Sequence, residues 1–352
     1  MSDEILIERQ GALGIITMNR PQALNTLSLA MYRRFDPALM GWAEDTNVRA
    51  VLVRGAGERA FCAGGDVVAI YEVRGEAVAS GGYKSDFFRE EYRLIRRIHR
   101  FPKPYIALMD GITMGGGAGV AVNGRFRIAT ARTVLAMPEV HIGLFPDVGA
   151  TRFLALAPGR TGLYLALTGT RIGAADALYC GFATHFMAHE REDELLGALA
   201  ALDQGENTDA AVAAVLHRFA ADPGSARLPP LRAAIDRVFT GGSVEAIMAA
   251  LAGERDDWAR EALAAMRRAS PLSLKLVFRQ LAEPVPDLEA ALTLEYRMTQ
   301  HVMAGHDFFE GIRAALVDKD RNPVWQHRTP EEVSAAEVDA YFAPIGDREL
   351  TF

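Results

Sequence analysis

Residues 104–119 read Pro-Tyr-Ile-Ala-Leu-Met-Asp-Gly-Ile-Thr-Met-Gly-Gly-Gly-Ala-Gly, and this stretch decides how the first half of the chain is interpreted. Residues 104–109 are an apolar run that predicts a buried β-strand. The glycines that follow predict a turn that opens a helix, because small apolar residues continue from Ala118 to Val122. A strand, a glycine-rich turn and a helix in this order indicate an α/β fold.

The glycine-rich turn does not match the two common phosphate-binding motifs. If Gly117 and Gly119 were the first pair of a dinucleotide fingerprint, the third glycine would fall at Val122. A P-loop is excluded because no Gly-Lys-Ser or Gly-Lys-Thr follows. Two interpretations remain: the helix-starting amides hold an oxyanion, or the small residues allow close helix packing.

The elements around this stretch extend the α/β pattern. Further strands are predicted at 5–8, 14–18, 48–54, 127–130 and 134–137, and helices at 28–42, 87–99 and after Gly115. We place this α/β region at residues 1–185. Residues 186–352 are predicted to be mostly helical, with helices at 195–202, 210–219, 231–239, 258–266 and 288–303. Whether this half is a separate domain or a helical cover stays open.

Composition excludes several classes of protein. The 352 residues carry a net charge of −7, from 38 basic and 45 acidic side chains, which argues against nucleic acid or an anionic membrane as partner. No apolar run approaches the roughly 20 residues that a membrane span needs. Early acidic residues argue against a secretory or transit signal, and only two cysteines fit a reducing compartment. We expect a cytoplasmic protein; a homo-oligomer is compatible with the sequence.

A candidate site lies at residues 137–149, Met-Pro-Glu-Val-His-Ile-Gly-Leu-Phe-Pro-Asp-Val-Gly. Its two acids, Glu139 and Asp147, are eight positions apart, and Gly143 and Pro146 argue against one continuous helix. A turn would let both acids face one pocket, where apolar neighbours raise a carboxyl pKa and suit it to acid, base or nucleophile chemistry. The alternative is that Glu139 caps a helix and Asp147 starts the next one.

A second glycine-rich turn offers further backbone amides, which the two acids would need as hydrogen-bond donors to an oxyanion. Residues 60–66, Ala-Phe-Cys-Ala-Gly-Gly-Asp, follow the predicted strand at 48–54, as residues 111–119 follow the strand at 104–109. Alone, the stretch would be an ordinary turn. Together, two amide-presenting turns can stabilise the oxyanion that forms on a thioester carbonyl, where losing one donor costs about 3 kcal/mol. A nearby carboxylate would act as base or nucleophile.

Three motifs make the sequence similar to the crotonase (enoyl-CoA hydratase/isomerase) superfamily. They are Phe-Cys-Ala-Gly-Gly-Asp at 61–66, Gly-Ile-Thr-Met-Gly-Gly-Gly at 111–117 and Met-Pro-Glu at 137–139. Within the superfamily, the 3-hydroxyisobutyryl-CoA hydrolase subgroup is the one the chain resembles most. The stretches that resemble it lie at 87–92, 142–149, 167–169, 305–308 and 318–320. The resemblance spans residues 5–325, including the helical half.

The resemblance implies a fold, a ligand and a set of site residues. The fold is a spiral of ββα units that binds a coenzyme A thioester, with a helical C-terminal region. The amides of Gly65 and Gly116 would form the oxyanion hole, and Glu139 would be catalytic. Glu91, Gly116, Glu139 and Asp147 would contact the substrate. No metal and no separate cofactor is expected, because coenzyme A is part of the substrate.

One departure from the superfamily pattern favours hydrolysis. Enoyl-CoA hydratases carry a second glutamate where this chain has Gly119, and they usually have glycine where it has Asp147. Asp147 is therefore the expected catalytic partner of Glu139. We expect 3-hydroxyisobutyryl-CoA to be hydrolysed to 3-hydroxyisobutyrate and coenzyme A, in valine breakdown. The alternatives are an enoyl-CoA hydratase or isomerase and a non-catalytic acyl-CoA-binding protein, which loss of Glu139 would have indicated.

Other conspicuous residues are interpreted as structural. His185 and His189 have helix-face metal spacing, but no glutamate directly follows His185, so the zinc-protease motif fails. The arginines between 93 and 100 alternate with apolar residues and indicate the exposed face of a helix. His141 is expected to point away from Glu139.

Overall fold

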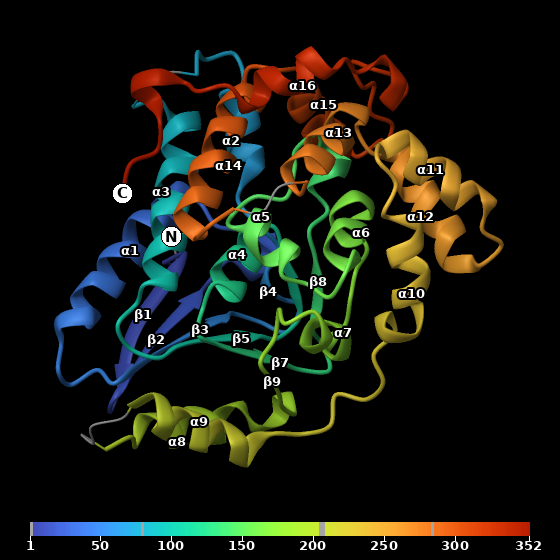
Figure 1. Cartoon of the computed structure of the whole chain (residues 1–352). Coiled ribbons are helices and arrows are strands. Elements are labelled where there is room, and N and C mark those ends of the chain that lie inside the picture. The colour runs from blue at the N-terminus through green and yellow to red at the C-terminus, as the bar shows by residue number, and fades with distance from the viewer. Residues whose placement is uncertain (1–2, 79–80, 204–207, 283–284) are drawn as a thin grey trace. The chain divides into compact units, whose positions relative to one another are not determined.

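The computed structural model describes residues 3–78, 81–203, 208–282 and 285–352 (Figure 1). The chain divides into two compact units, each assembled from several segments. The first comprises residues 1–65, 93–135 and 172–227, and the second comprises residues 66–92, 136–171 and 228–352. Helix α3 (Tyr83–His99) contributes residues to both.

A six-stranded sheet organises the first unit. Its strands, in spatial order, are β1 (Ile5–Gln10), β2 (Leu13–Met18), β3 (Ala50–Gly55), β5 (Tyr105–Met109), β7 (Phe126–Ala129) and β9 (His185–Phe186). β1 and β2 form an antiparallel hairpin, and each later neighbour pairs in parallel. The predicted strands are confirmed, with end shifts of one or two residues.

A smaller sheet accompanies the large one. It contains β4 (Ala60–Cys62), β6 (Ile112–Met114) and β8 (Val134–Ala136), in that order. The chain therefore alternates, since β3 and β4, β5 and β6, and β7 and β8 each place one strand in each sheet. This repeat confirms the expected ββα spiral, with helix α4 (Gly116–Val122) following β6. The sequence did not predict β4 and β6, because their residues lie within the stretches that were interpreted as glycine-rich turns.

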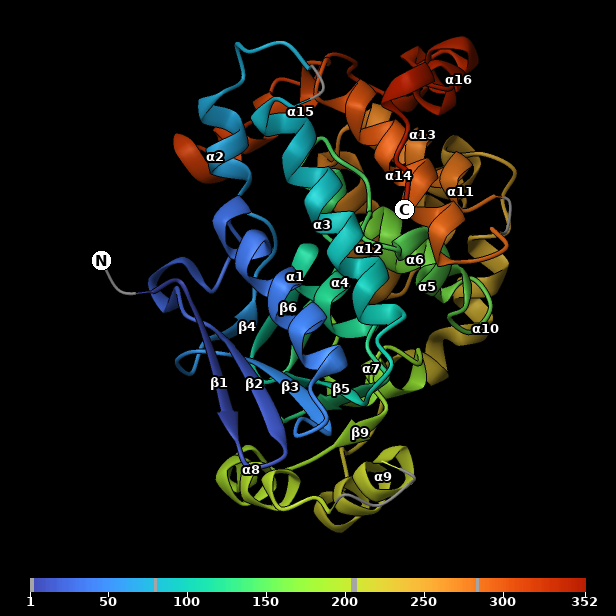
Figure 2. The same ribbon diagram turned by 90° about the vertical axis from the view of Figure 1, so that its left-hand side faces the viewer.

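Helices cover the large sheet. α8 (Glu192–Ala200) and α9 (Thr208–Phe219) lie along one face, below the sheet in Figures 1 and 2. Leu195, Leu199 and Val212 from these helices join strand residues such as Leu52 and Ile106 in one buried core. The remaining helices of the unit are α1 (Leu29–Glu44), which begins at the N-cap Ser28, and α7 (Ala174–Tyr179).

The second unit is mainly helical. Its helices are α2 (Val67–Glu72), part of α3, α5 (Ala150–Ala155), α6 (Thr161–Thr168), α10 (Leu228–Val238), α11 (Val244–Gly253), α12 (Asp257–Arg268), α13 (Pro271–Gln280), α14 (Leu288–Val302), α15 (Asp307–Ile312) and α16 (Ala335–Phe342). α16 packs on α13 and α14 (Figure 2). Over the described ranges, no helix is long and apolar enough to cross a membrane.

Candidate active site

The two glycine-rich turns meet in the first unit because the strands before them are neighbours. β4 and β6 pair in parallel, with Cys62 opposite Thr113, so both chains leave the same edge of the small sheet. A Cβ atom built on Gly64 would lie 3.8 Å from the backbone nitrogen of Gly116. Gly116 is the first residue of α4, where an amide has no intrahelical acceptor. The predicted oxyanion residues Gly65 and Gly116 thus belong to adjacent turns.

Gly117 keeps these turns close. A Cβ atom at this position would lie 2.2 Å from the carbonyl oxygen of Cys62, well inside van der Waals contact. Only glycine allows the start of α4 to approach the end of β4 this closely. The backbone itself therefore sets the positions of the amides.

The predicted acids lie in the second unit, in the irregular segment that the sequence indicated. Glu139 begins a single 3-10 turn, η2 (Glu139–Ile142), which ends at Gly143 with φ at 70°. A side chain on Gly143 would meet the carbonyl oxygen of Asp307 at 2.2 Å. Glu139 and Asp147 are each 4% exposed, and Glu91 on α3 is 2% exposed.

Glu139 is the most unusual of these groups. Burial raises its pKa well above the ordinary value, and the charges of Asp147 and Glu91 raise it further. Its Oε2 atom has no hydrogen-bond partner among the residues that the structure describes. Buried carboxyl oxygens are normally bonded, so an open Oε2 marks a group available to a ligand. The three predicted acids of this unit are therefore close enough to interact.

Asp147 is held by a residue that the sequence did not single out. The hydroxyl of Tyr92 donates a hydrogen bond of 2.6 Å to Asp147 Oδ2. Burial raises the pKa of Asp147 to about 6, and the Tyr92 bond opposes this rise. Burial also raises the pKa of Tyr92 well above its usual value, so the phenol remains the donor.

A buried network fixes the backbone that follows Asp147. Glu295 on α14 is fully buried, and its carboxylate accepts bonds from the amides of Gly149 (2.7 Å) and Thr151 (2.8 Å) and from the Thr151 hydroxyl (2.7 Å). Gln280 Nε2 donates to the Thr151 hydroxyl and, at 2.8 Å, to the carbonyl oxygen of Pro146. Burial raises the pKa of Glu295 to about 8. The hydrogen bonds from Gly149 and Thr151 oppose this rise, because they stabilise the charged carboxylate.

This network surrounds a strained residue. Val148, next to Asp147, has φ at 55°, in the left-handed region that β-branched residues rarely adopt. Such strain persists where surrounding contacts determine the backbone, and it is concentrated at functional sites. Glu295 and Gln280 hold the chain on either side of Val148. They therefore position Asp147 indirectly.

One signal in the sequence could have revealed Glu295. Glu295 lies on the buried, apolar face of α14. The helical period predicts a hydrophobic side chain at this position, because the other residues at the same spacing are Ala291, Leu292, Met298 and Val302. An acid at such a position needs buried partners. Tyr92 lies inside the quoted motif at 87–92, but nothing in the motif shows what its hydroxyl contacts.

The residues interpreted as structural have ordinary partners. His141 Nε2 lies 3.0 Å from the carbonyl oxygen of Thr168, and burial lowers the pKa of His141. Arg97 pairs with Asp36. His185 Nδ1 contacts the Thr184 hydroxyl at 2.8 Å. Within the described ranges, no three metal-ligating side chains converge.

Comparisons with known proteins match nearly the whole chain. Residues 13–342 match the family model described as enoyl-CoA hydratase/isomerase. The mitochondrial 3-hydroxyisobutyryl-CoA hydrolase of Danio rerio is 44% identical over 354 residues, covering 99% of this chain and 91% of that protein. The corresponding protein of Rattus norvegicus is 42% identical over 355 residues, with the same coverage.

Solved structures agree in fold but carry other reaction names. An enoyl-CoA hydratase from Rhodobacter sphaeroides 2.4.1 superposes with a TM-score of 0.91 at 41% identity, covering 99% of this chain and 100% of that chain. A carnitinyl-CoA dehydratase from Mycobacterium thermoresistibile also reaches 0.91, at 42% identity, covering 100% of this chain and 99% of that chain.

Proposed function

The chain belongs to the enoyl-CoA hydratase/isomerase family, and from this premise we propose that it hydrolyses the thioester of a short, branched β-hydroxyacyl-CoA. The best candidate substrate is 3-hydroxyisobutyryl-CoA, with 3-hydroxyisobutyrate and free coenzyme A as products. Relatives that carry the name of this reaction align with 99% of the chain at 42 to 44% identity. Identity at this level supports the reaction class more strongly than the acyl group.

The observation that carries the proposal is the state of Glu139. This carboxyl is 4% exposed, its Oε2 has no partner among the described residues, and its pKa is raised by burial and by Asp147. A purely structural acid would be expected to bond both oxygens. A carboxyl with an open oxygen and a raised pKa has the properties of a base or nucleophile.

Hydrolysis requires a nucleophile, an oxyanion site and a leaving group. In one route, the Glu139 carboxylate attacks the thioester carbon, the C–S bond breaks to release coenzyme A, and water then hydrolyses the mixed anhydride. In the other route, Glu139 takes a proton from the water that attacks directly. In both, the carbonyl oxygen gains negative charge, which the amides of Gly65 and Gly116 would stabilise.

Asp147 and Glu91 would select the substrate. A β-hydroxyl group donates a hydrogen bond, and a carboxylate accepts it, so Asp147 suits a hydroxyacyl chain better than a plain acyl chain. Tyr92 donates to Oδ2 of Asp147, and this bond holds the carboxylate that would accept from the substrate hydroxyl. The same carboxylate would orient the attacking water.

Enoyl-CoA hydration is the second candidate, because the similar protein from Rhodobacter sphaeroides carries that name. Hydration commonly uses two carboxylates to manage one water. At the position where the resemblance expects the second carboxylate, this chain has Gly119, a buried residue inside α4 whose carbonyl accepts a bond from Asn123. Asp147 supplies a second acid elsewhere, and this difference favours hydrolysis.

The decisive experiment separates the two reactions on one enzyme preparation. Purified protein is given a panel of acyl-CoA esters that includes 3-hydroxyisobutyryl-CoA, 3-hydroxypropionyl-CoA, isobutyryl-CoA and crotonyl-CoA. Thiol release is followed with a colorimetric thiol reagent, and loss of the alkene is followed by its absorbance. We expect thiol release, fastest with the β-hydroxy esters. Alkene loss from crotonyl-CoA without thiol release would replace hydrolysis by hydration.

A further inference from the structure

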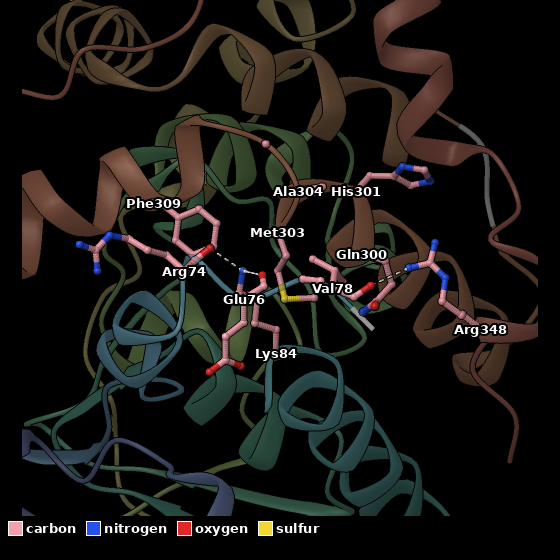
Figure 3. Close-up of a pocket in the computed structure, with 12 residues that line it drawn as sticks. Arg74, Glu76, Val78, Lys84, Gln300, His301, Met303, Ala304, Phe309 and Arg348 are labelled. Carbon is pink, nitrogen blue, oxygen red and sulfur yellow. Dashed lines mark hydrogen bonds between the residues drawn. The ribbon is translucent and has the colours of Figure 1, made fainter. Parts of the chain in front are cut away.

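A pocket of about 460 Å³ lies within the second unit (Figure 3). It is lined by the segment after α2, by the end of α14 and by single side chains of α3, α15 and the C-terminal segment. None of the proposed catalytic acids lines it. Its volume is within the range of small-molecule sites.

Gln300 on α14 is the feature that points to a ligand. The residue is 3% exposed and lines the pocket. Neither its Nε2 nor its Oε1 has a hydrogen-bond partner among the described residues. Buried side-chain amides are almost always hydrogen-bonded, so an amide without a partner in the protein indicates a bound ligand. This amide offers two donors and one acceptor to such a partner.

Two cations, Lys84 and Arg348, line the same pocket as this amide. Lys84 is 2% exposed and donates to the carbonyl oxygens of Arg74 (2.8 Å) and Glu76 (2.7 Å), so its ammonium group keeps one further N–H. Arg348 donates through Nη1 to the carbonyl oxygen of Val78 at 3.3 Å. Figure 3 shows the Glu76 carboxylate directed away from Gln300 and Arg348. The pocket therefore contains two cations in addition to the open amide.

The remaining wall is apolar. Met303 and Phe309 line the pocket, and Lys84 Nζ lies 4.9 Å from the centre of the Phe309 ring. A phosphate, which has no apolar part, would leave these side chains uncovered. A plain fatty acid would leave the carbonyl oxygen of Gln300 without a donor. A ligand that satisfies all groups has a carboxylate, a short hydrocarbon chain and a hydroxyl.

We propose that this pocket binds a short aliphatic hydroxycarboxylate. The carboxylate accepts from Lys84, Arg348 and the amide N–H of Gln300, and the ligand hydroxyl donates to Gln300 Oε1. Met303 and Phe309 cover the hydrocarbon chain. The site is separate from the proposed thioester chemistry and does not depend on it.

The test uses the whole chain and 3-hydroxybutyrate as the probe, measured by isothermal titration calorimetry. We expect 3-hydroxybutyrate to bind more tightly than butyrate, 3-hydroxybutyramide or inorganic phosphate. Gln300→Leu should weaken binding at least about 10-fold, as expected for the loss of buried polar contacts to a ligand. Failure of the wild-type protein to bind the probe, or equal binding of phosphate, would overturn the proposal.

The Gln300→Leu variant also distinguishes a ligand group from a structural one. Because the amide has no partner in the described protein, replacing it with leucine should leave the melting temperature unchanged or raise it. A clear decrease would mean that the amide bonds within the protein, which contradicts the proposal. Lys84→Met should weaken binding too, but Lys84 also holds two loop carbonyls, so the conclusion rests on Gln300.

Two further variants locate the probe. Lys275 pairs with Glu245 and does not line the pocket, so Lys275→Met should bind normally. Glu139→Gln should also bind normally, because Glu139 is not part of this pocket. Loss of binding in Glu139→Gln, with binding retained in Gln300→Leu, would place the probe at the proposed thioester site and overturn the proposal.

Discussion

The glycine turns of the first unit and the acid cluster of the second contain the proposed catalytic groups, but they are built in different ways. The turns are positioned by backbone alone: two paired strands end together, and Gly117 lets them approach within a distance that no side chain allows. The acids are positioned by side chains, with Tyr92 bonded to Asp147 and Glu295 bonded to the backbone after it.

This difference predicts different sensitivities. Backbone amides do not titrate, so the turns should respond to changes of shape and not to pH. The acid cluster holds several carboxyls out of water, which raises the pKa of Glu139, of Asp147 to about 6 and of Glu295 to about 8. Its geometry and its charge are therefore linked. Substitutions in the two regions should separate these effects.

Glu139→Gln should have the largest effect. It removes the base or nucleophile while keeping the shape of the side chain, so kcat for thiol release should fall about 10³- to 10⁴-fold. The melting temperature should not fall, because an amide replaces a carboxyl whose raised pKa shows that its charge is unfavourable. Turnover near the wild-type rate would remove Glu139 from the mechanism.

Gly117→Ala tests the first region by shape alone. Its Cβ atom would lie 2.2 Å from the Cys62 carbonyl oxygen, so the start of α4 must shift and carry the Gly116 amide with it. We expect kcat to fall about 10²- to 10³-fold, the range for a lost oxyanion donor, with no change in the shape of the pH profile.

A matched control for this substitution is Gly197→Ala in α8, where a new Cβ atom would meet nothing within 4 Å. This change should leave kcat alone and stabilise the helix by about 0.5–1 kcal/mol. Equal activity of the Gly117→Ala and wild-type enzymes would show that the close approach of the turns does not serve catalysis.

The backbone-built region could be predicted well from sequence. The apolar strand at 104–109 and the glycine turn after it are local features, and parallel strands bring their ends to one edge. The resemblance named Gly65 and Gly116, and the structure places their turns side by side. The short strands β4 and β6 were missed, because hydrogen bonding to distant neighbours makes them strands, not their own composition.

The side-chain-built region could be predicted only in part. The sequence indicated Glu139 and Asp147 because proline and glycine break the segment around them. It could not show Gln280 or Glu295, which lie more than a hundred residues away along the chain and act through the backbone at 146–151. Such partnerships depend on helix packing, which a single sequence does not specify.

Glu295→Gln tests whether those distant partners matter for catalysis. The amide nitrogen that replaces one carboxylate oxygen cannot accept a hydrogen bond. The backbone N–H of either Gly149 or Thr151 therefore loses its acceptor. With Val148 strained between them, the turn should relax and move Asp147, lowering kcat roughly 10- to 100-fold. Glu261→Gln, at an exposed position of α12 in the same unit, is the control and should be nearly neutral. Equal losses in both variants would show that the loss is not specific to the turn after Asp147.

Tyr92→Phe should have the smallest effect at high pH and is the most specific test of charge in the second region. Burial raises the pKa of Asp147 to about 6, and the hydrogen bond from Tyr92 opposes this rise. Without the bond, this pKa rises, so a larger fraction of Asp147 is protonated at pH 6 and cannot accept from the substrate hydroxyl. The acidic limb of kcat against pH should therefore move to higher pH, while activity above that limb stays within about threefold of wild type.

The control is Tyr105→Phe, which removes a buried hydroxyl that is bonded to the Val120 carbonyl in the first unit. This variant should leave the acidic limb in place. A shift in both variants, or in neither, would contradict the view that pH sensitivity belongs to the acid cluster.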